Sequence, residues 1–106
     1  KVISTFYNPG KFLAAFNHKA SMDNEQTAIV FETVSGRKYK VKQIAGLIAR
    51  RILNYMEPEM VVEKGERLGF IRFGSRVDII VPPNFKINVS LGDIVEGNLS
   101  IIGEFE

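Results

Sequence analysis

Cysteine and tryptophan are absent from this chain of 106 residues, and histidine occurs once, as His18. Without cysteine the chain can form no disulfide, no thiolate nucleophile and no cysteine-ligated zinc site. One histidine cannot build a multi-histidine metal centre, so we expect no metal cofactor. No apolar run approaches the roughly 20 residues that a membrane-spanning helix needs.

The remaining composition is typical of a folded domain. Hydrophobic residues make up 45% of the chain and charged residues 25%, so we predict a single domain with one modest core over residues 1–106. The net charge of +2 permits contact with an anionic surface but does not predict a nucleic-acid partner. The chain starts at Lys1 and shows no secretory signal, so we expect it to be an excised or cleaved part of a longer protein.

The first half of the chain has the pattern of short strands joined by turns. Residues 2–7 are strand-like and end at Asn8-Pro9-Gly10, whose residue types favour a turn. Residues 27–34 and 37–43 predict the arms of a hairpin that turns at Ser35-Gly36. Three lysines share one face of the second arm, which predicts a solvated face or, alternatively, a patch for anionic headgroups: Lys38, Lys40 and Lys42.

Residues 44–56 fit two structures, because their apolar spacing suits a helix whereas Gly46 and the β-branched residues favour a strand. The second half of the chain is punctuated by glycine turns. The segments VVEKGERLG (61–69) and VSLGDIVEGNLSIIG (89–103) are loosely alike. We therefore predict an all-β fold, a compact sandwich or barrel of short strands resembling a barrel-sandwich hybrid, built from two loosely similar halves.

The stretch LGFIRFGSRVDIIVP, residues 68–82, predicts one continuous strand whose odd-numbered apolar residues face the interior. The pair Gly74-Ser75 stands in its middle, although glycine weakens a strand interior. Period two places Ser75 on the apolar face. Three roles are open to its hydroxyl: a nucleophile with a histidine base, a buried structural group, or attack on the carbonyl of Gly74. The Gly-x-Ser-x-Gly motif of the first role is absent.

Three stretches together resemble the C-terminal half of the phosphatidylserine decarboxylase proenzymes, of the short bacterial and archaeal type. They are KGERLGFIRFGSRVDIIVP, YNPGKFLAAFNHKASMDNE and QIAGLIARRI, and FGSRVD is the most specific part. The resemblance implies self-cleavage of the Gly74–Ser75 bond. The Ser75 oxygen attacks the Gly74 carbonyl to give an ester, elimination leaves dehydroalanine, and hydrolysis gives a covalent pyruvoyl group. Residues 1–74 would then belong to the β-chain, and residues 75–106 would form the α-chain.

The resemblance further implies an enzyme, a carboxy-lyase that converts phosphatidylserine, or the archaeal serine ether phospholipid, to the ethanolamine phospholipid. The pyruvoyl ketone would condense with the substrate amine and act as an electron sink, without a metal. The expected location is the cytoplasmic face of the cell membrane, as a peripheral protein. The family's activating Asp and His belong to an upstream segment, so we expect these residues alone to be inactive and the Gly74–Ser75 bond to stay intact.

Four further residues are candidate substrate contacts. The family's Asn-Glu-Arg motif stands here as Asn24-Glu25-Gln26, which makes Asn24 and Glu25 candidates although the arginine is missing. Arg72 and Arg76 flank the Gly-Ser pair and can contact a phosphate or a carboxylate, with ordinary solvated or paired arginines as the alternative. We do not assign His18 a role.

A second class of function is a non-catalytic β module that resembles biotinyl or lipoyl carrier domains. Such a carrier needs a modifiable lysine at a hairpin tip. The tip here is TVSGRK, which lacks the usual acidic-Lys or Met-Lys-Met surroundings. An adduct of lipoyl or biotinyl mass on a lysine would support the carrier, and cleavage near residue 74 would support the decarboxylase.

Overall fold

A computed structural model of the chain describes residues 1–10, 24–46, 52–71, 75–97 and 99–105. Within these ranges every regular element is a β-strand, which confirms the all-β prediction. The strands are β1 (Val2–Asn8), β2 (Gln26–Glu32), β3 (Lys38–Ile44), β4 (Ile52–Asn54), β5 (Gly69–Ile71), β6 (Arg76–Ile80), β7 (Phe85–Ile87) and β8 (Gly103–Phe105).

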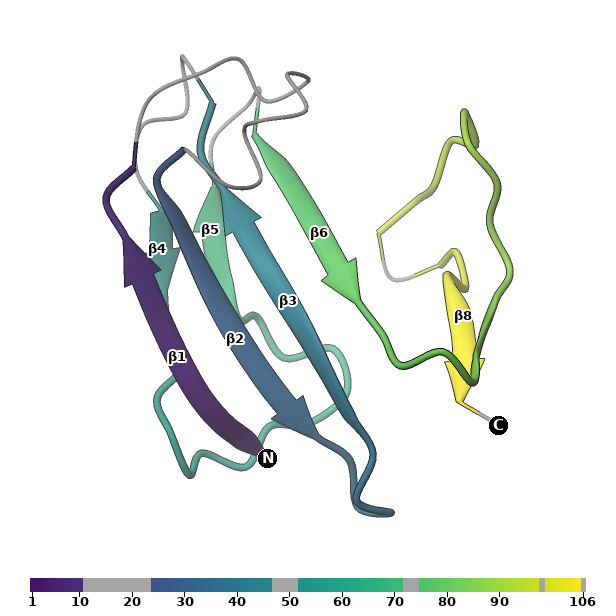
Figure 1. The fold of residues 1–106 in the computed structure, drawn as a ribbon, viewed down its shortest axis with the longest axis horizontal. Helices are drawn as coiled ribbons and strands as arrows, with labels where there is room; N and C mark the ends of the chain where they lie inside the picture. The colour runs from purple at the N-terminus through teal and green to yellow at the C-terminus, as the bar shows by residue number, and fades with distance from the viewer. Residues whose placement is uncertain (11–23, 47–51, 72–74, 98, 106) are drawn as a thin grey trace.

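The largest sheet is antiparallel and has the strand order β1-β2-β3-β6 (Figure 1). Its central hairpin, β2–β3, turns where the sequence predicts. Gly36 has a φ of 84°, and Thr33 accepts a hydrogen bond of 3.0 Å from the Gly36 amide. Along β3 the lysines are exposed or half-buried, whereas Val41 and Gln43 on the other face are buried. The lysine side chains are thus accessible, as both interpretations of this face require, and the face with Val41 and Gln43 packs inward.

The hairpin β4–β5 forms a second layer behind β2 and β3 (Figure 1). The apolar core between the layers is small and consists of Val2, Ile29, Phe31, Val41 and Met56. In the ambiguous segment 44–56, Ile44 ends β3 and residues 52–54 form β4, which favours the strand alternative. Residues 45–46 and 55–56 are irregular, and residues 47–51 lie outside the described ranges.

The strands β7 and β8 pair with each other beyond β6 (Figure 1). Phe85 and Phe105 meet edge to face, with ring centroids 5.0 Å apart, and Phe105 also contacts Tyr39 of β3 at 6.0 Å. The loop between these strands exposes large apolar side chains, with Leu91 and Ile94 almost fully exposed.

The two similar segments of the second half form the same turn, at residues 63–66 and 90–93. Gly65 and Gly92 have φ values of 85° and 88°, the left-handed geometry that the third position of a type II turn requires. In both turns the fourth residue's amide donates to the first residue's carbonyl at 3.1 Å. The carboxylate of the fourth residue also accepts a hydrogen bond from the amide of the first residue. The distance is 3.2 Å from Glu63 to Glu66 and 2.9 Å from Ser90 to Asp93. Val61 and Val62, just before the first of these turns, lie outside any strand.

The prediction of one continuous strand over residues 68–82 is wrong. β5 pairs with β4, whereas β6 pairs with β3 in the other sheet, and residues 72–74 between them are not described. The interior placement of Val77 and Ile79 is also wrong, because they are 54% and 47% exposed. Alternation reports which face of a strand is apolar, but sheet membership depends on distant partners. β6 is an edge strand, which the β4–β5 layer leaves partly uncovered (Figure 1).

Candidate functional site

Ser75 lies immediately before β6, is half-buried, and lines a cavity of about 330 Å³. This Ser75 cavity opens between the end of β3, the hairpin strand β5 and the start of β6. Its walls are mainly apolar, and the lining residues are Val41, Gln43, Leu68, Gly69, Phe70, Ile71, Ser75 and Val77. Gln43 and Ser75 are the polar side chains among these eight residues.

Strand register explains why Gln43 and Ser75 share this cavity. Gln43 pairs with Val77, and residues two apart on a strand face the same side of a sheet. Continuing this register one residue beyond the paired stretch, which ends at Arg76, makes Ser75 the diagonal neighbour of Gln43, at a spacing of about 7–8 Å that long side chains can bridge. The arrangement brings a hydroxyl and a primary amide to one apolar cavity.

The side chain of Gln43 is 3% exposed, and its Oε1 atom has no hydrogen-bond partner. The amide packs against Gly69 of β5. A Cβ atom on that glycine would lie 2.6 Å from Gln43 Nε2 and would also collide with the carbonyl oxygen of Leu53. Gly69 therefore provides the space that the Gln43 amide occupies.

Glu25 lies at the same end of the main sheet, just before β2. Its carbonyl accepts a hydrogen bond of 2.9 Å from the amide of Ala45, the residue after β3. The Glu25 side chain is 9% exposed, and its Oε2 accepts a hydrogen bond from the Tyr7 phenol. Its Oε1 is buried without a hydrogen-bond partner, like Oε1 of Gln43. Among the described residues, the buried oxygens without a partner thus gather at the end of the sheet where Ser75 lies.

The other predicted contact residues have structural partners or are not described. Asn24 is fully buried, and its Nδ2 donates to the carbonyl of Ala45 at 2.6 Å. Arg76 forms an ion pair with Asp78, with 2.6 Å between Nε and Oδ1 and a second contact of 3.3 Å from Nη2 to Oδ2. Gly74, Arg72 and His18 lie outside the described residues.

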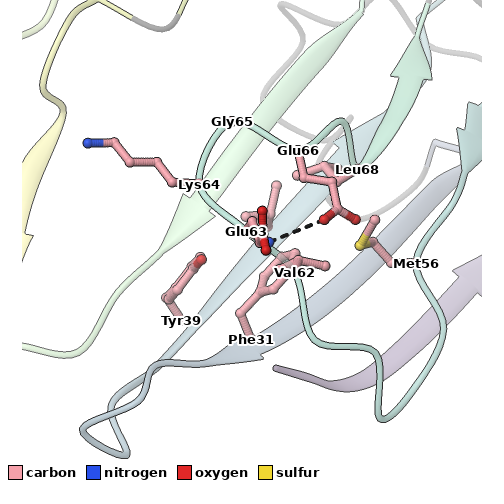
Figure 2. A pocket seen from close by; sticks show the side chains of 10 residues that line it. Phe31, Tyr39, Met56, Val62, Glu63, Lys64, Gly65, Glu66 and Leu68 are labelled. Carbon is pink, nitrogen blue, oxygen red and sulfur yellow. Dashed lines mark hydrogen bonds between the residues drawn. The ribbon is translucent and has the colours of Figure 1, made fainter.

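Two further hollows lie away from Ser75. One, of about 200 Å³, lies where the turn 63–66 covers the core, with Phe31, Met56 and Leu68 at its base and a charged rim (Figure 2). The other, of about 350 Å³, lies between Tyr39, Ile79 and the β7–β8 pair and is lined mainly by apolar side chains. The described part of the chain contains no cluster of three potential metal ligands and no helix that could cross a membrane.

Sequence reasoning missed Gln43 and Tyr7 as residues at this end of the sheet. A signal for Gln43 was present, since it shares a strand face with Val41 and is a polar residue at an apolar position of the alternation. Tyr7 offered no comparable signal, because its bond to Glu25 joins residues 18 apart in the chain.

The fold is all-β, and Ser75 lines a mainly apolar cavity together with the buried amide of Gln43. These features define a β-structured domain with a candidate nucleophilic site. Comparison with known proteins identifies the family: the sequence matches the family described as "Phosphatidylserine decarboxylase" over residues 1–103, and the chain belongs to it. The resemblance found in the sequence is thereby confirmed, and the carrier-domain alternative loses its support.

Several relatives are named "Phosphatidylserine decarboxylase proenzyme". The protein of Nitrosomonas eutropha is 47% identical over 100 residues, covering 94% of this chain and 46% of the relative. The protein of Geotalea uraniireducens is 45% identical, and the match covers 97% of this chain and 48% of the relative. The protein of Syntrophus aciditrophicus is 47% identical, and the match covers 99% of this chain and 49% of the relative. The chain thus spans about half the length of these relatives. No solved structure matches it.

Proposed function

We propose that these residues are the C-terminal part of a phosphatidylserine decarboxylase proenzyme, which cleaves itself between Gly74 and Ser75 and then decarboxylates a serine phospholipid. The observation that carries the proposal is the position of Ser75, half-buried in a cavity at a junction between two sheets. Family membership supports the reaction class, and the word "proenzyme" in the relatives' names is consistent with processing.

The location of Ser75 suits a cut that leaves the fold in place. Residues before it are held by the β1-β2-β3 ladder and the β4–β5 hairpin, and residues after it by the pairing of β6 with β3. Cleavage at 74–75 breaks neither set of pairs. The products, with residues 1–74 in the β-chain and 75–106 as the α-chain, would therefore remain associated.

The Ser75 hydroxyl needs a base, because a neutral hydroxyl is a weak nucleophile. The described lining of the cavity offers the amide of Gln43, which is not a base, and no carboxylate or imidazole. We therefore assign the activating group to an upstream segment of the same proenzyme, which is consistent with relatives about twice as long as this chain.

A pyruvoyl group formed from Ser75 fits this cavity. It would replace the serine side chain and amine with a smaller planar group in a cavity that the Gln43 side chain also lines. Such a ketone supplies an electron sink for a substrate amine. The walls around it are mainly apolar and include Leu68, Phe70 and Val77.

Of the other candidate contacts, the structure favours Glu25 over Asn24, because the Asn24 amide is engaged with Ala45 whereas Glu25 Oε1 has no partner. Arg76 would have to exchange its ion pair with Asp78 for a substrate anion. The phospholipid substrate implies a peripheral protein on a membrane surface, and we propose the cytoplasmic face. The lysine face of β3 is available to anionic headgroups there.

The test uses the full-length protein that contains these residues. The unaltered protein should yield a fragment that begins at position 75, lighter than the corresponding serine peptide by the elements of ammonia. It should also release CO₂ from phosphatidylserine in detergent micelles. Ser75→Ala should remain one chain and release none. An unaltered protein that stays uncleaved and inactive would refute the proposal.

Ser35→Ala is the matched control. It removes a hydroxyl from the exposed turn between β2 and β3, far along the chain from the cavity. Its cleavage and CO₂ release should equal those of the unaltered protein.

A further inference from the structure

The amide of Gln43 is unusual because it is buried in a mainly apolar cavity and leaves its acceptor unused. Burying a polar atom without a partner is costly, and native proteins rarely accept it without a functional reason. Glu25 Oε1, just before the neighbouring strand, is also buried without a hydrogen-bond partner. Both orphaned atoms are oxygens, so the group that would satisfy them must donate hydrogens.

The register places Gln43 between Glu25 on one side and Ser75 on the other. Thr27 pairs with Gln43, so Glu25, two residues before Thr27, is its diagonal neighbour on one side. Ser75, two residues before Val77, is its diagonal neighbour on the other. A donor bound at Gln43 Oε1 would thus lie within side-chain reach of residue 75, with the Glu25 carboxylate as the next charge.

We propose that Gln43 Oε1 is the subsite for the primary amine of the substrate headgroup, holding an N–H of that amine beside residue 75. The inference rests on the proposed function and deepens it by naming the residue that recognises the amine. An ammonium has three donors and no acceptor, so it complements orphaned oxygens, whereas a phosphate or a carboxylate does not.

A neutral amide also suits the reaction better than a charged residue would. It binds an amine without fixing its positive charge, and the amine must lose a proton before it can attack a ketone. Among the described lining residues none is a cation, so the amide does not itself stabilise a carboxylate on the neighbouring carbon before CO₂ departs.

The experiment measures binding in a protein that cannot be cleaved. Full-length Ser75→Ala is titrated by calorimetry with glycerophosphoserine, glycerophosphoethanolamine and glycerophosphoglycerol, of which the last has no amine. Adding Gln43→Leu should weaken binding of both amine ligands about tenfold to hundredfold, the range of a hydrogen bond to a charged group. Binding of glycerophosphoglycerol should change less than twofold. Gln43→Glu, which keeps an acceptor oxygen, should retain amine binding.

Thr27→Val in the same Ser75→Ala background is the matched control, because Thr27 is equally buried on the paired strand but does not line the cavity. It should leave all three affinities unchanged. Unchanged affinity of the Gln43→Leu protein for every ligand, or equal weakening of all three, would overturn the inference. Unchanged affinity would mean that water alone satisfies the Gln43 oxygen. Absence of any preference for amine ligands in Ser75→Ala itself would overturn it too.

Self-cleavage separates this inference from the proposed function. Gln43→Leu with Ser75 restored should still cleave at 74–75, because the amide acts on the substrate. Failure of a folded Gln43→Leu protein to cleave would overturn the amine role. Cleavage by the unaltered protein together with unchanged ligand binding in the Gln43→Leu protein would leave the decarboxylase proposal standing and remove the amine subsite.

Discussion

Tyr7 donates a hydrogen bond from its phenol to Oε2 of Glu25, which ties the end of β1 to the residue just before β2. The bond lies at the same end of the sheet as Ser75. It leaves Glu25 Oε1 buried and unpartnered, so the carboxylate depends on Tyr7 for a donor to its other oxygen. The hydrogen bond between Tyr7 and Glu25 thus holds β1 and the start of β2 together at this end of the sheet.

Tyr7→Phe should therefore destabilise the protein by about 1–3 kcal/mol, the cost of leaving a buried acceptor without its donor. Denaturant unfolding monitored by circular dichroism measures the change. Phe6→Leu is the control, since Phe6 is the neighbouring side chain on the opposite face of β1 and is 65% exposed. A Tyr7→Phe protein as stable as the control would show that Glu25 does not need the phenol.

Gly69→Ala should cost about 1–3 kcal/mol or more, as overpacking does in well-packed interiors. The added methyl group would collide with the backbone oxygen of Leu53 and press on the Gln43 amide. Gly97→Ala is the matched substitution, because a Cβ atom there meets nothing within 4 Å. Its thermal midpoint should stay close to that of the unaltered protein, and equal midpoints for the two variants would contradict the packing around Gly69.

Gly65→Ala and Gly92→Ala should destabilise by similar amounts, about 1–2 kcal/mol each, because both glycines adopt left-handed backbone angles that strain an L-residue. Neither position has an atom within 4 Å of the added Cβ, so the cost is conformational and steric contact adds nothing. Unfolding of the two variants side by side tests the equivalence of the turns. A large loss in one and none in the other would show that the turns differ energetically.

Tyr39 should make stability fall at high pH. Burial raises the pKa of its phenol above the ordinary 10.0, so the folded protein keeps this proton to higher pH than the unfolded chain does. The contribution of Tyr39 to the free energy of unfolding is complete below the pKa of the phenol in the unfolded chain. It is lost as the pH rises through the higher pKa of the folded protein. Tyr39→Phe keeps the ring stacked on Phe31, at 5.2 Å between centroids, but removes the titrating group.

The thermal midpoints of the unaltered protein and Tyr39→Phe, compared between about pH 9 and pH 11, give the measurement. The decline with pH should be shallower in the variant. Parallel curves for the two proteins would exclude a contribution from the Tyr39 phenol.

Local sequence pattern predicted the strands of the first half and the turns that end them. Residues 27–43 alternate around Ser35-Gly36, and this pairing of neighbours in the chain became the β2–β3 hairpin. The glycines of the two similar segments predicted turns because few other residues accept a positive φ. The Gly74-Ser75 motif likewise pointed to the family, since a motif is a property of consecutive residues.

The tertiary structure decided which strands share a sheet and what surrounds Ser75. Alternation over 68–82 is identical for one long strand and for two strands in different sheets, because period two depends only on neighbours along the chain. The partners of β5 and β6 are β4 and β3, which lie far away in sequence. The position of the Gln43 amide depends in turn on the space at Gly69, so only the packed fold could bring Gln43 and Ser75 to one cavity.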